Sequence, residues 1–184
     1  VPLDGLPNPL TSIDFSLEAN ETTEIRTTGD SDPLVTGWAR ATATEPIRGT
    51  AVFQVRDQTD ALFEAGVGDA PATGRAILFA SRPSSIPSVA FSTGIALANP
   101  SESRAHIEIT FQRRLPDPGV FTAIVNLEPG EHTARFLEEL FEEEAPPGSE
   151  GTLIIESEIP VVVTALRTAN GYPMSSYPVG IPGK

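Results

Sequence analysis

The chain has 184 residues, and 25 acidic against 12 basic side chains give it a formal net charge of −13. This excess of negative charge argues against nucleic acid as a partner and against anionic membrane surfaces. The absence of cysteine excludes disulfides, thiolate metal sites and cysteine nucleophiles. No apolar run approaches the roughly 18 residues of a membrane span, so we expect no membrane insertion.

Short apolar runs with a two-residue period, separated by clusters of Gly, Pro, Asn and Asp, predict an all-β chain. Ile13, Phe15 and Leu17 alternate with polar residues in this way. In chain order, we expect strands at residues 13–17, 22–27, 34–43, 47–56, 62–67, 75–81, 91–98, 105–113, 120–127, 151–157 and 161–168. Their length and spacing favour antiparallel β-sandwiches.

One helix is predicted, from Thr133 to Glu144. Apolar side chains recur on one of its faces and glutamates on the other. Pro146, Pro147 and Gly148 end it. We interpret the acidic face as solvated and not as a calcium site, because it lacks the convergent loop geometry that calcium needs.

Two pairs of segments repeat in the same order. Residues 16–23 match residues 126–133 at an offset of 110, and residues 44–52 match residues 158–166 at an offset of 114. This order predicts a tandem duplication. Runs 91–98 and 105–113 precede the second copy, and their counterparts would lie before Val1. The first unit is therefore expected to be incomplete.

The predicted fold is accordingly all-β, with two tandem antiparallel sandwich-like units of which the first is incomplete. We place the first unit, with an extended N-terminal segment, at residues 1–81 and the second at residues 82–184. The serine-rich stretch 82–88 is interpreted as the linker between them.

Candidate catalytic residues are few. His106 and His132 are the two histidines, and neither belongs to an H-E-x-x-H motif or has a third ligand at useful spacing. No G-x-S-x-G motif is present either. We therefore expect no enzyme activity, no cofactor and no metal site. Arg40 and Arg167 are interpreted as structural, each with a local carboxylate or carbonyl partner.

The aromatic residues allow two interpretations. Trp38, the single tryptophan, is expected to pack in the core. In the alternative, Trp38, Tyr172 and Tyr177 would present stacking faces to a sugar ring, as aromatic side chains do on the surfaces of β-sandwiches.

Several motifs carry a resemblance. Residues 36–40 (TGWAR), 93–100 (TGIALANP), 132–137 (HTARFL) with 139–141 (ELF), and 165–168 (ALRT) are among them. Together they are similar to a largely uncharacterised β-sandwich repeat of secreted or surface proteins of environmental bacteria, acidobacteria-like ones among them. The resemblance covers nearly the whole chain after about residue 10. It implies an extracellular appendage and carries over no catalytic residues.

The resulting hypothesis is a non-catalytic extracellular structural protein, a subunit of a bacterial surface fibre or assembly that self-associates by β-strand complementation. The N-terminal segment, with Val1, Leu3, Leu6 and Leu10, is the candidate donor, because it is proline-rich and can lie extended along a sheet edge. A start without methionine and the surface-like composition favour this location. The alternative is a carbohydrate-binding or adhesion module of a larger secreted protein, with a polysaccharide as its partner.

Overall fold

The computed structural model describes residues 12–27, 37–56, 62–83, 91–142, 144–170 and 172–182. The chain divides into two compact units, Val1–Thr42 and Ala43–Lys184. Each is described by itself. As expected, the fold is all-β with antiparallel ladders and one small helix.

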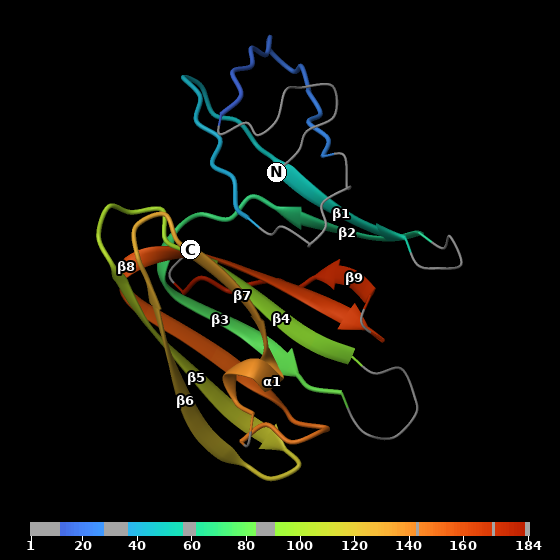
Figure 1. Ribbon diagram of the computed structural model, residues 1–184, viewed down its shortest axis with the longest axis vertical. Helices are drawn as coiled ribbons and strands as arrows, with labels where there is room; N and C mark the ends of the chain where they lie inside the picture. The colour runs from blue at the N-terminus through green and yellow to red at the C-terminus, as the bar shows by residue number, and fades with distance from the viewer. Residues whose placement is uncertain are drawn as a thin grey trace. The chain divides into compact units, whose positions relative to one another are not determined.

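The second unit holds all the regular elements of the described residues (Figure 1). In chain order these are β1 (Thr50–Arg56), β2 (Leu62–Gly68), β3 (Thr73–Ser81), β4 (Phe91–Ala98), β5 (Ala105–Leu115), β6 (Gly119–Leu127), β7 (His132–Phe136), α1 (Leu137–Leu140), β8 (Glu150–Ala169) and β9 (Tyr172–Ser176). Strands β1 and β2 form a separate hairpin.

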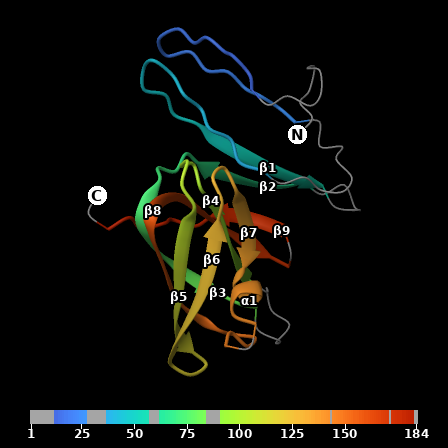
Figure 2. The same ribbon diagram turned by 60° about the vertical axis from the view of Figure 1, so that its left-hand side comes forward.

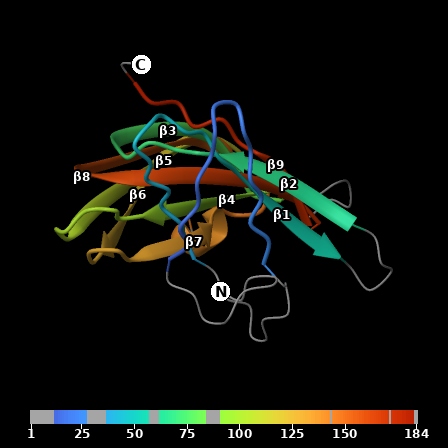
Figure 3. The same cartoon turned by 90° about the horizontal axis from the view of Figure 1, so that it is seen from above.

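The long strand β8 joins two sheets. Its first part pairs with β3 and β5, and its second part pairs with β4 and β9. One sheet therefore has the order β6-β5-β8-β3 and the other the order β7-β4-β8-β9. Figure 3 shows β8 running across the unit between its neighbours. The β5 ladder reaches β8 residue Ser157 and the β4 ladder begins at Val162, so Pro160, which has no N–H, lies where β8 changes partners.

The core lies between these two sheets because apolar side chains alternate along their strands. On β5 the inward residues are fully buried and their neighbours exposed. The largest fully buried side chains include Leu97, Ile107, Ile109, Phe111, Leu137, Phe141, Leu153 and Ile155. Gly151 permits the close approach of β8 to β5, since a Cβ there would lie 2.2 Å from the Gln112 carbonyl oxygen.

The helix is shorter than predicted. Residues 132–136 form β7, which pairs with β4, and α1 covers only Leu137–Leu140. Leu137 and Phe141 are buried, as the amphipathic pattern predicts. The residues before them, however, pair with β4 as a strand and do not extend the helix. Backbone pairing to a neighbouring strand here outweighs local helix propensity.

The division of the chain also differs from the expected one. The boundary lies after residue 42, whereas the sequence suggested residue 81. Strand β3 pairs with β8 over most of its length, so residues 73–81 belong to the sandwich of the second unit. The two strands expected at 151–157 and 161–168 are one continuous strand, β8.

The first unit contains a turn and extended arms. Residues 19–20 form the turn, and no regular strand is assigned within the described residues 12–27 and 37–42, although strands were predicted at 13–17 and 22–27. A two-stranded hairpin is only marginally stable in water unless a third strand or a packed face supports it. Apolar and polar residues therefore alternate in these segments as they do in strands, but the described residues of the segments form no regular strand.

The repeated segments can be compared directly. Residues 16–23 and 126–133 both contain a four-residue turn with the same backbone hydrogen bond. Residues 44–52 bend at 44–45 and then enter β1, whereas residues 158–166 lie inside β8. Both β1 and β8 continue into an antiparallel hairpin, with β2 and β9 respectively. The tandem duplication stays a prediction.

Candidate functional site

On one side of the sandwich, residues 177–181 of the chain cover the edge strand β3. Residues 177–181 follow β9 and pass along β3, where Ile77 and Gly180 exchange backbone hydrogen bonds of 2.9 and 2.8 Å. The Tyr177 N–H also donates to the Ala165 carbonyl, at 2.9 Å. Covering an edge in this way removes a template for pairing with other chains.

The opposite side is not covered in the same way. Among the described strands, β6 pairs only with β5 and β7 only with β4. Figure 2 shows β6 and β7 near each other on this side, with α1 at the lower end of β7. A groove of about 310 Å³ lies between them. It is lined by Ala123, Ile124, Val125, Asn126, Leu127, Glu131, His132, Thr133, Arg135, Glu139 and Leu140.

Strand β6 is an unusual edge. In a chain with 37 charged residues, 25 acidic and 12 basic, its nine residues carry no charge and no proline. On its outer face Val120 is 68% and Ile124 48% exposed. On its inner face Phe121, Ala123 and Val125 are only partly buried against the core. An edge strand of this kind can accept a further strand.

The rest of the groove is polar. Glu139 accepts a hydrogen bond from the Phe136 N–H at 2.6 Å, at the start of α1. His132 lies on β7, while His106 is outside the groove lining and its Nδ1 lies 2.9 Å from the Asn126 Oδ1. Within the described ranges, no group of three or more His, Asp or Glu side chains could hold a metal ion. The groove therefore combines the uncharged strand β6 on one side with polar and charged side chains of β7 and α1 on the other.

A second hollow, of about 210 Å³, lies where β2, the middle of β8 and the segment after β9 meet. Its lining is largely apolar and includes Val67, Val163, Tyr177, Val179 and Ile181. The ring of Tyr177 is half-buried and its centroid is 6.3 Å from that of Phe79. Tyr177 thus belongs to the segment, residues 177–181, that covers β3.

The candidate sugar-stacking residues do not form one platform. Trp38 lies in the first unit and is 37% exposed, so the expectation that it packs in the core is wrong. The Arg40 guanidinium lies 5.5 Å from the centre of its ring. Tyr172 begins β9 in the second unit, and its side chain lies outside the description.

The candidate donor residues Val1, Leu3, Leu6 and Leu10 also lie outside the described residues.

Arg167 is held by aromatic rings. Its guanidinium carbon lies 3.4 Å from the centre of the Phe91 ring and 6.0 Å from that of Tyr177. Its Nε is buried and has no hydrogen-bond partner among the described residues. The expected carboxylate or carbonyl partner is replaced at Nε by cation–π stacking, which is consistent with a structural role.

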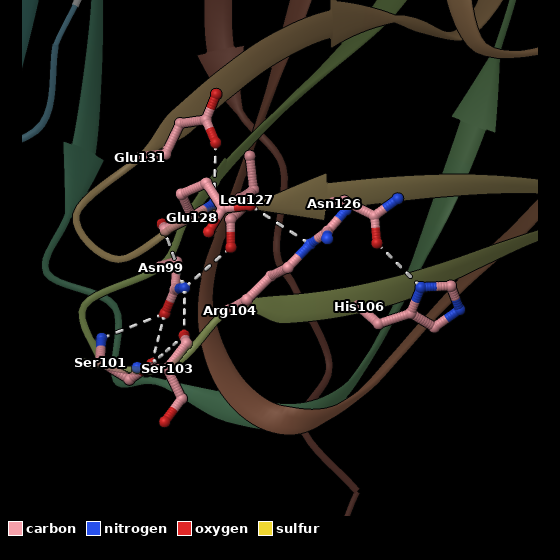
Figure 4. Close-up of polar contacts among 9 residues, drawn as sticks. All are labelled: Asn99, Ser101, Ser103, Arg104, His106, Asn126, Leu127, Glu128 and Glu131. Atoms are coloured by element: carbon pink, nitrogen blue, oxygen red, sulfur yellow. Dashed lines mark hydrogen bonds and ion pairs between the residues drawn. The ribbon is translucent and has the colours of Figure 1, made fainter.

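Asn99 is a structural residue whose role the sequence did not indicate. It is fully buried, and its side chain ties the β4–β5 connection to the β6–β7 turn (Figure 4). Its Nδ2 donates to the carbonyls of Ser103, Leu127 and Glu128 at 2.8, 3.0 and 3.2 Å. Its Oδ1 accepts from the Ser101 N–H and hydroxyl. The only signal in the sequence was an Asn-Pro pair directly after an apolar strand.

No family model matches the chain, and the comparison with curated proteins gives no match. The solved structures that are similar to parts of it include the following two. The Anabaena sensory rhodopsin transducer covers 52% of this chain and 96% of its own, at 18% identity and a TM-score of 0.41. A Thermotoga maritima protein, 1070, covers 59% of this chain and 90% of its own, also at 18% identity and a TM-score of 0.41.

Across the described part of the chain, the structure contains no helix with the length and apolar character needed to cross a membrane.

Proposed function

We propose that this chain is a non-catalytic structural protein that joins copies of itself by β-strand complementation, as a subunit of an extracellular bacterial assembly. The observation that carries the proposal is the uncharged edge strand β6, with the groove beside it. A donor strand at this edge would take up the unpaired backbone groups of β6 and cover its partly buried inner side chains.

The contrast between the two open sides supports this choice of edge. The side between β3 and β9 is covered by the chain's own residues 177–181. The side between β6 and β7 has no such covering segment among the described residues. Within the described residues, the β6 edge is therefore the better candidate of these two sides for a partner strand.

The donor in this proposal is the N-terminal segment of a neighbouring copy. Residues 1–10 carry Val1, Leu3, Leu6 and Leu10, no positively charged side chain and three prolines, a residue type that favours an extended backbone. Such a segment can supply main-chain hydrogen bonds along β6 and apolar side chains to the groove. The extracellular location rests on the sequence resemblance.

The test is sedimentation velocity on the full chain and three variants. The full chain should form oligomers, whereas deletion of residues 1–10 should yield monomers. Ile124→Lys, on the exposed face of β6, should also yield monomers, because a lysine on an edge strand blocks pairing. Val52→Lys is the matched control, since Val52 is 54% exposed on β1 and lies away from that edge.

Two results would reject the proposal. One is a full chain that stays monomeric at the highest soluble concentration. The other is an oligomer that persists unchanged in both the deletion and Ile124→Lys. Thermal melting of each variant should remain close to that of the full chain, which separates loss of assembly from loss of folding.

The exposure of Trp38 favours one second candidate, a polysaccharide-binding module. A stacked sugar ring would change the emission of this single tryptophan, so the titration of soluble polysaccharides against its fluorescence tests the idea directly. Trp38→Phe keeps an aromatic face but removes the signal, and serves as the blank. An emission spectrum unchanged by polysaccharide would remove this candidate.

A further inference from the structure

The Arg167 side chain is held in place without an anionic partner. It lies on β8, opposite Thr93 of β4 and Ser175 of β9 in the two ladders (Figure 1). Phe91 stands two residues before Thr93 and therefore on the same face of the sheet, and the Arg167 guanidinium carbon lies 3.4 Å from the centre of its ring. The Thr93 hydroxyl has another partner, because its Oγ1 accepts a hydrogen bond from the Ser81 N–H at 3.0 Å.

Other arginines of the chain do have oxygen partners. The half-buried Arg82 and Arg113 both donate hydrogen bonds to main-chain carbonyls. A carboxylate oxygen lies within 3.3 Å of Arg26, Arg48, Arg75 and Arg104. Arg167 is also half-buried, yet among the described residues it makes no hydrogen bond or ion pair, although the chain has 25 acidic residues against 12 basic ones.

The nitrogens of Arg167 differ in their access to solvent. Nε is buried, so a ligand cannot reach that side of the guanidinium. The terminal nitrogens Nη1 and Nη2 are not buried and have no hydrogen-bond partner in the described part of the chain. A guanidinium presents these groups in a fixed fork that matches the two oxygens of a carboxylate. The end of the side chain is therefore open to a bidentate ion pair.

Aromatic rings extend from this guanidinium to the surface. The Tyr177 ring centre lies 6.0 Å from the Arg167 guanidinium carbon and 6.3 Å from the centre of the Phe79 ring. Phe79 is 46% exposed, so the rings reach solvent. A ligand whose carboxylate meets Arg167 can therefore place an apolar body against Tyr177 and Phe79.

We propose that Arg167, Phe91, Tyr177 and Phe79 form a binding site for a small monocarboxylate with an apolar body. Phe91 holds the guanidinium, which pairs with the carboxylate, and the other two rings contact the body. One guanidinium balances one negative charge, whereas a doubly charged phosphate would add an unbalanced charge to a chain that already carries −13. The site goes beyond the assembly function and does not depend on the β6 edge, because none of its residues lies on β6.

The experiment is saturation-transfer NMR on the full chain with benzoate as the probe, a measurement that suits monomers and assemblies alike. We expect saturable binding of benzoate. Acetate, which lacks the apolar body, should bind about tenfold more weakly or worse, and benzyl alcohol, which lacks the carboxylate, should not bind. Hexanoate should also bind, and its affinity relative to benzoate distinguishes an aliphatic from an aromatic body. Inorganic phosphate that displaces benzoate as well as hexanoate does would overturn the choice of a monocarboxylate.

Three variants test the roles of the side chains. Arg167→Lys keeps the positive charge but removes the fork, so benzoate should bind about tenfold more weakly. Phe79→Ala, at an exposed position, should reduce the affinity for benzoate towards that for acetate and leave acetate unaffected. Arg135→Gln is the matched control, because this arginine lies exposed on β7, and it should leave the binding of benzoate unchanged.

A second measurement uses the unaltered chain and so does not depend on the folding of any variant. The side-chain Nε–H resonance of Arg167, assigned through its proximity to the Phe91 ring, should shift as benzoate is added and stay in place with benzyl alcohol. Absence of both this shift and saturation transfer at about 10 mM benzoate overturns the proposal. Equal binding of benzoate and benzyl alcohol overturns it too, as does benzoate binding that a folded Arg167→Lys variant retains in full.

Discussion

Asn99 concentrates more polar contacts than any other described side chain of the sandwich. Its five side-chain hydrogen bonds are made at 0% exposure, and without them the carbonyl of the buried Leu127 would lose this donor. Because a buried unsatisfied group costs about 1–3 kcal/mol, a single asparagine can decide whether the β4–β5 connection stays closed.

Asn99→Ala should lower the free energy of unfolding by about 2 kcal/mol, because the buried Leu127 carbonyl loses the Asn99 donor, whereas the carbonyls of Ser103 and Glu128 keep a donor in the Ser101 hydroxyl and the Glu131 N–H. Urea denaturation followed by circular dichroism measures this. Asn126→Ala is the matched control, since its exposed side chain hydrogen-bonds only to the His106 ring among the described residues and should cost less than about 0.5 kcal/mol. Equal losses in the two variants would contradict the role given to Asn99.

For single residues, the sequence predicted which side chains are buried more accurately than it predicted what each side chain does. In the strand predicted at residues 105–113, the apolar residues Ile107, Ile109 and Phe111 recur every second position and are all buried. The role of Asn99 could not be read from the sequence, because it depends on which turn lies opposite the β4–β5 connection. Trp38 was misplaced for a related reason, since the burial of a lone aromatic depends on neighbours that its own strand does not determine.

At the scale of the strands, the two sides of the sandwich differ in whether the edge strand is covered by other residues of the chain. Residues 177–181 cover β3, whereas β6 remains an edge of nine uncharged residues. Predicting β6 as a strand needed only its alternation. Predicting that it is an edge needed the pairing order, which single-strand patterns do not contain. The same limit explains why β8 was expected as two strands, since its change of partners at Pro160 is a property of the neighbouring strands.

Removal of residues 177–184 should open the second edge. The half-buried Tyr177 and Val179 would be lost, and the free energy of unfolding should fall by about 2 kcal/mol. The Ile77 amide, which now donates to the Gly180 carbonyl, should exchange with solvent markedly faster.

Hydrogen exchange monitored by NMR reports both changes, and removal of residues 183–184 alone is the control. If the Ile77 amide keeps its protection after the longer truncation, the segment does not cover the edge.

On the scale of the whole molecule, net charge opposes the association that the β6 edge favours. Each copy carries a formal charge of −13, so neighbouring copies repel one another. The uncharged β6 contributes nothing to this repulsion, and the donor segment 1–10 contains one acidic residue, Asp4. The contact surfaces are thus nearly neutral while the remainder of the chain is acidic.

Self-association should therefore strengthen with ionic strength. Raising the salt concentration from about 0.05 M to about 0.5 M shortens the Debye length from roughly 14 Å to roughly 4 Å, which screens repulsion between exposed charges but leaves backbone pairing and apolar contacts in place. Sedimentation equilibrium across this range should show a rising oligomer fraction for the full chain and none for the chain lacking residues 1–10. An interface held by ion pairs would behave in the opposite way, so oligomers that dissociate as salt is added would show that β6 pairing is not what joins the copies.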